Sequence, residues 1–387
     1  MKGKSMPFEL TKEQRDIQKA AREFAEGELL PEVALEHDLA QKFPRDIWKK
    51  ACQLGFIGIH FPEEFGGQGC GVLENILVTE QFCRKDSGLG IALSFSDFAS
   101  EIVLRFGDEN QKNRFLPPIP KAKALSAGAL TEPEHGCDPE SISTTAKREG
   151  SRYVLDGEKS FVINGPAADW LVVLCQTDSK AKPRSGGQSL FVVERGAEGL
   201  KVVPSGEKMG MHMTGMGDIT FSKTRVPLES RIGSEGSGFD RTKRFLEENR
   251  MEVAAQAVGI AGGALEKAIA YAKKRYTFGR PIIEHQGLQW MLAEMATQVE
   301  AARSFLYDVG SRFDRGEGKI GPQTAMVKMF ASDVAMRVST DAVQVFGGLG
   351  YMEDLPLERT MRDSKATQIY LETNQIEKMV IGDYLKR

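Results

Sequence analysis

The chain has 387 residues, of which 41% are hydrophobic and 27% are charged. It carries 51 basic and 54 acidic side chains, so its formal net charge is only -3. This balance is typical of a globular protein and excludes the broad positive field that a nucleic-acid-binding protein presents. At this length we expect two or three packed regions rather than one core.

The five cysteines are odd in number and lack CxxC spacing, so we expect reduced thiols and no metal site. No stretch approaches the roughly 20 apolar residues that a membrane span needs. The first residues are polar and do not resemble a signal peptide. These features predict a cytoplasmic protein without a membrane span.

From about Thr11 to Lys123 the pattern is helical. The stretch from Lys12 to Leu30 is rich in Glu, Lys, Ala and Arg and precedes Pro31, which predicts a helix that ends there. Phe61 to Gly71 is a loop rich in Pro and Gly. Because its glycines do not follow a strand, we interpret it as a connector and not as a nucleotide-binding turn.

Between about Ser126 and Gly238, short β-rich runs replace the helical pattern. Tyr153 to Leu155 and Ser160 to Ile163 flank Asp156-Gly157, which predicts a hairpin with a tight turn. Further strands are predicted at Trp170 to Cys175, Ser189 to Val193, Leu200 to Val203 and Ile219 to Phe221. The region is predicted to be a small β-barrel or sandwich.

From about Phe239 onward the helical pattern returns. Apolar residues recur at steps of four and three, which predicts a core seam of an antiparallel helix bundle: Leu288, Leu292, Met295, Val299, Ala302, Leu306, Val309 and Phe313. The fold class is therefore α+β, with a helical domain at residues 1–124, a β domain at 125–238 and a helical domain at 239–387.

Five motifs stand in a fixed order along the chain. They are Ala129–Pro133 (ALTEP) followed by Gly136-Cys137-Asp138, then Lys159–Gly165 (KSFVING), Arg275–Gln286 (RYTFGRPIIEHQ), Gln344–Gly350 (QVFGGLG), and Arg362-Asp363 with Gln368–Gln375 (QIYLETNQ). Singly, such motifs are more typical of turns and helix ends. As an ordered set over nearly the whole chain, they resemble the acyl-CoA dehydrogenase family.

The resemblance implies an FAD-dependent homotetramer with a four-helix C-terminal bundle, which oxidises an acyl-CoA and passes electrons to an electron-transferring flavoprotein. The residues that it assigns to FAD are Leu130, Thr131, Gly136, Cys137, Phe161, Ile163, Arg275, Phe278, Gln286, Gln344, Gly347, Gly348, Thr373 and Gln375. Those that it assigns to the substrate are Phe95, Cys137, Glu247, Asn249, Arg250 and Leu371.

Physical reasons support several of these assignments. A flavin that accepts hydride gains negative charge, which the Thr131 hydroxyl and nearby backbone N–H groups would stabilise. Gly347 and Gly348 have no side chains and let the backbone approach a pyrophosphate, with which Arg275 can pair. The resemblance places these three on the FAD of a neighbouring subunit. Cys137 lacks an evident activating partner, which argues against a nucleophile.

Three positions depart from the family pattern. Ile163 stands where the family commonly has Thr, so a hydrogen bond to the flavin is missing or replaced. Leu371 stands where most relatives have the glutamate that removes the α-proton of the thioester. Asn249 occupies the second family position for this base. The usual base is therefore absent from both positions.

Three carboxylates are candidates to replace it. Glu372 and Glu248 each lie one residue from a family position, but one residue turns a helical side chain by about 100°, so Glu248 should point away. Asp97 lies among Phe95, Phe98 and Leu93, on a stretch that lines the acyl pocket in the family. Burial there would raise its pKa toward that of a useful base. The alternative is an Asp on a solvated face or at a helix N-cap.

These observations predict a short or cyclic acyl-CoA as substrate. With a base far from the α-carbon, the γ-proton of an α,β-unsaturated thioester could be removed, which would give a conjugated diene. The reaction is similar to that of cyclohex-1-ene-1-carboxyl-CoA dehydrogenases of anaerobic aromatic and alicyclic metabolism. Ordinary α,β-dehydrogenation of a saturated acyl-CoA through Glu372 is one alternative. A non-catalytic flavin-binding scaffold is another.

Overall fold

The computed structural model describes residues 9–317 and 320–386. The chain divides into two compact units. The helical unit consists of Met1–Leu35, Cys70–Ile91 and Arg250–Arg387. The sheet unit consists of Glu36–Gly69 and Ala92–Asn249.

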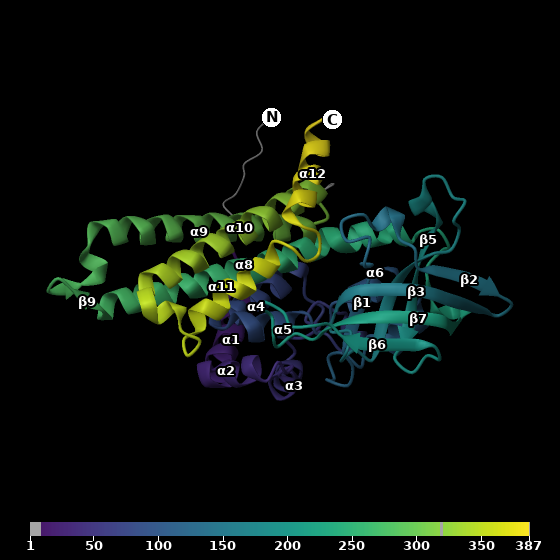
Figure 1. Ribbon diagram of the computed structural model, residues 1–387, viewed down its shortest axis with the longest axis horizontal. Coiled ribbons are helices and arrows are strands. Elements are labelled where there is room, and N and C mark those ends of the chain that lie inside the picture. Colours follow the sequence, from purple (N-terminus) through teal and green to yellow (C-terminus); the bar gives the residue numbers. More distant parts are fainter. Residues whose placement is uncertain (1–8, 318–319, 387) are drawn as a thin grey trace. The chain divides into compact units, whose positions relative to one another are not determined.

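The sheet unit contains one eight-stranded sheet (Figure 1). Its strands are β1 (Ser126–Ala129), β2 (Thr145–Glu149), β3 (Arg152–Ile163), β4 (Trp170–Gln176), β5 (Gln188–Glu194), β6 (Leu200–Pro204), β7 (Met216–Pro227) and β8 (Arg231–Ile232). The order across the sheet is β6-β7-β3-β2-β4-β5-β8, and β1 pairs in parallel with β4. All four further strands predicted from the sequence are present. The short helices α3 (Arg45–Gln53), α6 (Ser100–Phe106) and α7 (Glu109–Phe115) belong to the same unit.

The predicted hairpin turn at Asp156-Gly157 is wrong. Both residues lie inside β3, which runs through from Arg152 to Ile163. Gly157 instead marks a shift in the β3–β7 register and has a φ of 141°. A Cβ atom there would lie 2.7 Å from Thr144 Cα. The Asp-Gly pair therefore serves a bulge with close backbone approach, a use of glycine that a local pattern does not separate from a turn.

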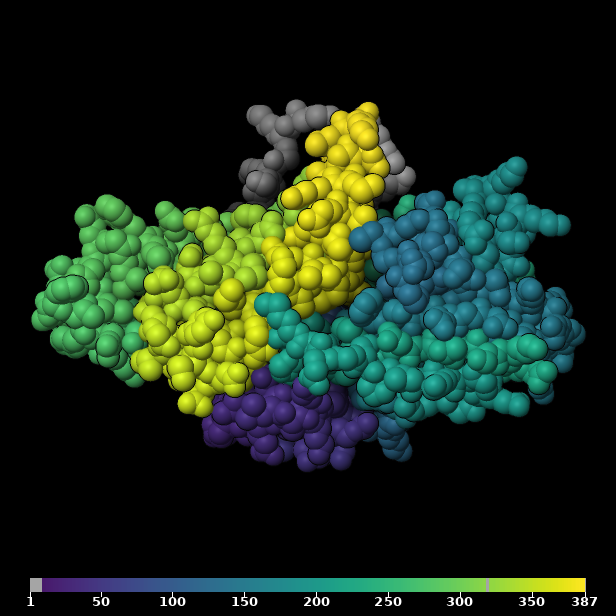
Figure 2. Space-filling model, viewed as in Figure 1, coloured from purple at the N-terminus to yellow at the C-terminus, as the bar shows by residue number. Residues whose placement is uncertain are grey.

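The helical unit is built on long helices that run side by side in Figure 1. Its elements are α1 (Lys12–Glu28), α4 (Val72–Lys85), α9 (Gln286–Asp314), α10 (Gly321–Phe346), α11 (Pro356–Thr367), α12 (Asn374–Leu385) and most of α8 (Gly238–Lys274). A short hairpin of β9 (Tyr276–Thr277) and β10 (Arg280–Pro281) connects α8 to α9. The green-to-yellow surface in Figure 2 belongs to α9, α10, α11 and α12.

The predicted apolar seam is confirmed on α9. Its inner positions are buried, and Leu288 and Phe313 pack against the same core at the two ends. The predicted first helix is also present as α1, with the Thr11 side chain accepting from Gln14 N in a capping box. Pro31 begins the next helix, α2 (Pro31–Leu39), because proline suits a first helical turn.

Among the described residues, one helix has the length and composition of a membrane span, although no such span is predicted from the sequence. An apolar window of α8 has a mean hydropathy of 1.2, but 78% of it is buried inside the protein. Burial of this kind is typical of a core helix. The five cysteines form no disulfide.

The α9 seam can be tested by Leu306→Ala. The Leu306 side chain is fully buried, so its truncation should leave a cavity and lower the free energy of unfolding by about 2–5 kcal/mol. Ser304→Ala, on the exposed side of α9, should change it by less than about 0.5 kcal/mol. Urea denaturation of both variants measures the difference, and equal effects would contradict the seam.

Candidate active site

The loop that carries Leu130 and Thr131 is held by a buried ion pair. Lys159 on β3 is fully buried and donates to the Leu130 carbonyl and to Glu132 Oε1, each at 2.9 Å. Glu132 also accepts from Ser143 N at 2.6 Å. Burial by itself would raise the pKa of Glu132, but Lys159 and the hydrogen bonds lower it to about 2. One ion pair thus joins the ALTEP and KSFVING motifs. The sequence alone did not predict this pairing of Lys159 with Glu132.

The end of β3 carries the other residues predicted to face the flavin. Ser160 N donates to the Thr131 carbonyl at 2.9 Å, so β3 and the ALTEP loop are in register. Phe161 is 64% exposed and has a φ of 56°, which turns its side chain out of the strand pattern. Ile163 is buried, so it presents an apolar side chain where a hydroxyl is common in the family.

The segment around Asp97 is attached to these same strands. Asn164, which follows β3, donates to the Phe95 carbonyl at 2.7 Å. Ala99 N donates to Ser126 Oγ on β1 at 3.1 Å. The Phe98 ring packs over Gly128, where an added Cβ would lie 2.9 Å from it. Asp97 is therefore fixed relative to the strands that lead into the Thr131 loop.

Asp97 itself is half-buried and lies between α5 (Ser87–Ser94) and α6. Gly58 N donates to its Oδ2 at 3.1 Å, and burial raises the pKa of Asp97 to about 6. The helix α6 has Ala99 at its N-cap and no side-chain cap, so Asp97 is not the N-cap of that helix. Both predicted aromatic neighbours are buried, and Phe95 and Phe98 meet edge to face with centroids 5.5 Å apart.

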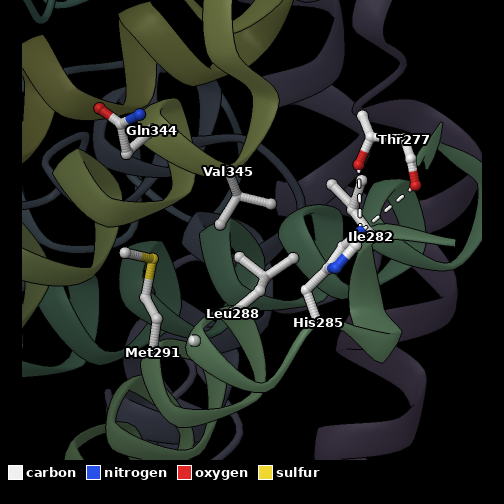
Figure 3. Close-up of a pocket in the computed structure, with 8 residues that line it drawn as sticks. Thr277, Ile282, His285, Leu288, Met291, Gln344 and Val345 are labelled. Carbon is white, nitrogen blue, oxygen red and sulfur yellow. Dashed lines mark hydrogen bonds between the residues drawn. The ribbon is translucent and has the colours of Figure 1, made fainter.

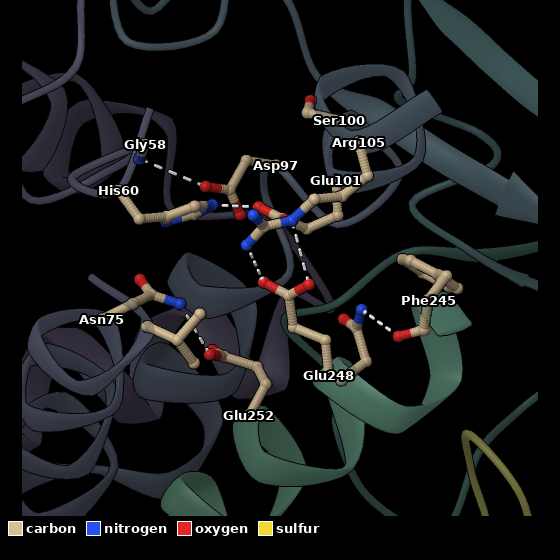
Figure 4. Close-up of polar contacts among 12 residues, drawn as sticks. Gly58, His60, Asn75, Asp97, Ser100, Glu101, Arg105, Phe245, Glu248 and Glu252 are labelled. Carbon is tan, nitrogen blue, oxygen red and sulfur yellow. Dashed lines mark hydrogen bonds and ion pairs between the residues drawn. The ribbon is translucent and has the colours of Figure 1, made fainter. Parts of the chain in front are cut away.

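Glu248 does not stand alone but joins an ionic cluster in the sheet unit (Figure 4). It is buried and accepts from Arg105 Nε at 3.1 Å. Burial, and next the charge of Glu101, raise the pKa of Glu248 to about 7. His60, Glu101 and Arg105, which complete this cluster, are not predicted from the sequence, because no motif or spacing relates them.

Glu372 is engaged by Arg250 in the helical unit. Arg250 Nε and Nη2 both donate to Glu372 Oε2, at 3.0 and 2.5 Å. The same guanidinium lies 2.9 Å from Glu377 Oε2, and both Arg250 and Glu377 are buried. Arg250, assigned to the substrate by the family resemblance, therefore has two carboxylates as partners inside its own unit.

The segment between α11 and α12 has an unusual backbone. Leu371 and Glu372 have φ values of 48° and 80°, in the left-handed region. Lys328 on α10 donates to the Glu372 carbonyl at 2.6 Å and to Asn374 Oδ1 at 3.0 Å, which supports this backbone. Thr373 is the N-cap position of α12.

The remaining positions assigned to the substrate lie on α8. Asn249 is buried, and its Nδ2 donates to the Phe245 carbonyl of its own helix at 2.9 Å. Glu247 is half-buried. The buried amide of Asn249 satisfies a backbone group of α8 and supplies no carboxylate at the second family position.

The helical unit has a pocket of about 320 Å³ that includes Gln344, one of the residues assigned to FAD (Figure 3). Gln344 lines it together with Thr277, Ile282, His285, Gly287, Leu288, Met291 and Val345. Gln286 is exposed beside it, and the Phe278 side chain is 96% exposed. The RYTFGRPIIEHQ and QVFGGLG motifs therefore meet at one pocket, although they are far apart in the sequence.

The glycines assigned to FAD are open. An added Cβ at Gly136, Gly347 or Gly348 would meet nothing within 4 Å. Gly347 ends α10 with a φ of 62°. Arg275, Gln375 and Cys137 are exposed. The three glycines therefore leave room for close approach of a ligand to the backbone.

The class of protein follows from comparisons with known sequences and structures. The models for the N-terminal, middle and C-terminal domains of acyl-CoA dehydrogenases match residues 11–123, 127–224 and 236–386. The chain therefore belongs to the acyl-CoA dehydrogenase family, whose members are FAD-dependent oxidoreductases that act on the CH–CH bonds of acyl-CoA thioesters.

Individual relatives agree over the full length. The short-chain specific acyl-CoA dehydrogenase of Clostridium acetobutylicum is 39% identical over 386 residues, which is 99% of this chain and 100% of that protein. The structure of butyryl-CoA dehydrogenase from Megasphaera elsdenii is 38% identical, with a TM-score of 0.94 and coverage of 99% and 100%. A chain in a structural study of an electron transferring flavoprotein of Acidaminococcus fermentans is 42% identical, also with a TM-score of 0.94 and the same coverage.

The residues present fit FAD. The large aromatic side chains of Phe161 and Phe278 are exposed, as expected for rings that a bound molecule covers. The open glycines suit close backbone approach to phosphates. The Thr131 loop, pinned by Lys159 and Glu132, offers hydroxyl and backbone donors in a fixed place.

The Lys159–Glu132 pair can be tested through the pH dependence of stability. Because folding lowers the pKa of Glu132 from 4.5 to about 2, the stabilisation is complete above its ordinary pKa and is lost as the pH falls toward 2. Glu132→Gln should cost about 3–5 kcal/mol at neutral pH, because it leaves the Lys159 charge buried and unpaired.

The difference in melting temperature between wild type and Glu132→Gln should therefore shrink from about pH 5 to about pH 3. The exposed neighbour Glu134 supplies the control Glu134→Gln, which should follow the wild type at every pH. A difference that stays constant with pH would show that the ion pair does not stabilise the loop.

Proposed function

We propose that this enzyme catalyses a 1,4-elimination from cyclohex-1-ene-1-carboxyl-CoA that yields cyclohexa-1,5-diene-1-carboxyl-CoA, with Asp97 as the base. The observation that carries the proposal is that neither position that the family resemblance assigns to the base, Leu371 or Asn249, holds a carboxylate. Leu371 replaces the family's glutamate, and the one acidic neighbour, Glu372, is paired with Arg250.

The Arg250 pair argues against Glu372 as a base. A base must present an oxygen to a carbon-bound proton, but Glu372 Oε2 already accepts two guanidinium hydrogen bonds. A neighbouring cation and such hydrogen bonds stabilise the charged form of a carboxylate and weaken it as a proton acceptor. Release of Glu372 would also leave Arg250, which is buried, with Glu377 alone.

Asp97 has the properties that a relocated base needs. Burial raises its pKa to about 6, so it is ionised at neutral pH and yet a stronger base than an exposed aspartate. The hydrogen bonds through Asn164 and Ser126 hold its segment against the strands that carry the flavin motifs. The buried rings of Phe95 and Phe98 favour a short or cyclic acyl group over a long chain.

The electron count of the reaction is balanced. FAD supplies the hydride acceptor when it is bound. Asp97 accepts the proton from C3, the γ-carbon, whose C–H bonding electrons form the C2=C3 double bond. The former C1=C2 pair moves to C1=C6 as hydride leaves C6. The product is a conjugated diene, and one proton and one hydride are removed in total.

Ordinary α,β-dehydrogenation of a short saturated acyl-CoA is the second candidate. The names of the relatives favour it, because they include a short-chain specific enzyme and a butyryl-CoA dehydrogenase. It would require Glu372 to leave Arg250. A flavin-binding scaffold without catalysis is a third reading, which bleaching of the flavin absorbance by any acyl-CoA would exclude.

We also propose a location, an oligomeric state and an electron acceptor for the enzyme. We place it in the cytoplasm as a homotetramer with domains near residues 1–124, 125–238 and 239–387, and with an electron-transferring flavoprotein as acceptor. The similarity to the Acidaminococcus fermentans study supports the acceptor. The exposed Phe278 and open Gly347 support FAD contacts that cross a subunit boundary.

Asp97→Asn tests the base. It keeps the size of the side chain but cannot accept a proton, so turnover of cyclohex-1-ene-1-carboxyl-CoA should fall by about 10²–10⁴-fold while FAD stays bound. Wild-type turnover should also decline as the pH falls below about 6, because Asp97 becomes protonated. Glu372→Gln is the matched control and should retain diene formation, measured by mass spectrometry. The opposite pattern would establish Glu372 as the base.

Leu371→Glu tests the position at which most relatives have the catalytic glutamate. It restores a carboxylate at the family position, so dehydrogenation of butyryl-CoA should rise by at least about 10²-fold over wild type. Leu371→Gln, whose side chain has the shape of glutamate but cannot accept the proton, should show no such rise. Flavin reduction in an anaerobic titration measures both. Wild-type enzyme that already oxidises butyryl-CoA efficiently, and leaves the cyclohexene thioester untouched, would overturn the proposal.

A further inference from the structure

The segment between α11 and α12 contains two adjacent residues with a strained backbone. Leu371 and Glu372 have φ values of 48° and 80°, and no other two neighbouring non-glycine residues in the described part of the chain both have a positive φ. A residue with a Cβ atom is strained in this region, so it persists there only where other contacts hold it. The conformation at Leu371 therefore depends on groups outside the segment.

Lys328 of α10 is the group that binds the strained backbone. Its side chain is fully buried, and its Nζ donates to the Glu372 carbonyl at 2.6 Å and to Asn374 Oδ1 at 3.0 Å. Burial lowers the pKa of Lys328 to about 8, against the charges of Glu377 and Glu372, so Lys328 is still a cation at neutral pH. A charged donor makes a stronger hydrogen bond to a carbonyl than a neutral donor does.

Asn374 attaches the end of the segment to the same helix. Asn374 is buried, and its Nδ2 donates to Ser332 Oγ of α10 at 2.9 Å. Its backbone N–H donates to the Gln368 carbonyl at 3.0 Å, which closes the segment on itself. Both ends are thus fixed, and the hydrogen bond from Lys328 to the Glu372 carbonyl holds the backbone between them.

The directions of two side chains depend on this backbone. Arg250 donates twice to the Glu372 carboxylate, which requires Glu372 to keep its present φ. Leu371 immediately precedes it and shares a peptide group with it. Without the hydrogen bond from Lys328, the strain favours a return to ordinary φ values, and both side chains then change direction.

We infer that Lys328 is a positioning residue, which keeps Leu371 at the position that the family resemblance assigns to the base and keeps Glu372 on Arg250. The inference rests on the proposed function, in which an apolar side chain at this position suits the cyclohexene thioester and a carboxylate there suits a saturated acyl-CoA. Lys328 thereby maintains the preference of the enzyme for the cyclohexene thioester.

The first test measures this preference in the enzyme with FAD bound. For each protein, kcat/KM is determined with cyclohex-1-ene-1-carboxyl-CoA and with butyryl-CoA. Lys328→Met keeps a long apolar side chain but donates no hydrogen bond, so the ratio of the two values should fall by at least about tenfold. A variant that merely folds less well contains fewer active molecules, which lowers both values alike and leaves their ratio unchanged.

Substitutions at Glu372 separate a backbone effect from a charge effect. Glycine adopts a positive φ without strain, whereas alanine does not. In Lys328→Met, an additional Glu372→Gly should therefore give a kcat/KM for the cyclohexene thioester at least about tenfold above that with Glu372→Ala. When Lys328 is present, the same two substitutions should differ by less than about threefold. Both double variants lack the same two charges, so equal values for them would show that Lys328 acts only through its charge.

Lys267 of α8 supplies a matched control. It is half-buried and donates to the Lys85 carbonyl at 3.2 Å in the same unit. Lys267→Met should keep the wild-type ratio, and a fall equal to that of Lys328→Met would contradict the positioning role. Flavin absorbance and melting temperature verify that each variant binds FAD and folds. If Lys328→Met alone does not fold, the two double variants decide the question by their difference.

Failure of the positioning role and failure of the proposed function give different results. If the wild type prefers butyryl-CoA to the cyclohexene thioester, the proposed function is wrong, and the inference fails with it. If the wild type prefers the cyclohexene thioester and Lys328→Met keeps the wild-type ratio, the positioning role alone is wrong.

Discussion

The function that we propose depends on the ion pair between Arg250 and Glu372. The pair occupies the carboxylate nearest to Leu371, at the end of a backbone segment that Lys328 holds in a left-handed conformation. Release of Glu372 would break one of the two ion pairs of the buried Arg250 and leave Glu377 as its carboxylate partner, and breaking a buried ion pair costs stability. The position from which relatives draw the α-proton is thereby left without a free acid.

The base that we propose, Asp97, lies in the sheet unit. Asp97 follows a helix and would ordinarily be free to turn, but hydrogen bonds to Ser126 and Asn164 on either side of it fix the segment. The same strands carry Thr131 and Ile163. These hydrogen bonds hold the Asp97 segment in a fixed place relative to the flavin motifs, as the proposed general base requires.

Buried charge is used in two distinct ways. The single positive charge of Lys159 is paired with the single negative charge of Glu132, which also accepts a hydrogen bond from Ser143 N. This pair holds the Thr131 loop. In contrast, the three carboxyl groups of Asp97, Glu101 and Glu248 outnumber the nearby cations His60 and Arg105, and burial raises the pKa of Asp97 to about 6 and that of Glu248 to about 7. A matched pair resists titration, whereas an unmatched cluster exchanges a proton easily.

The sequence by itself determined the family, the order of helical and β regions, the α9 seam and the loss of glutamate at Leu371, because periodicity and ordered motifs are local in the chain. It could also identify Asp97 as an acid among aromatic residues. Only the tertiary structure decided that Asp156-Gly157 is a bulge, that Arg250 holds Glu372, and that His60 and Glu101 accompany Asp97. These depend on contacts between residues far apart in the chain, and pairing of charges across such distances leaves no periodic trace in the sequence.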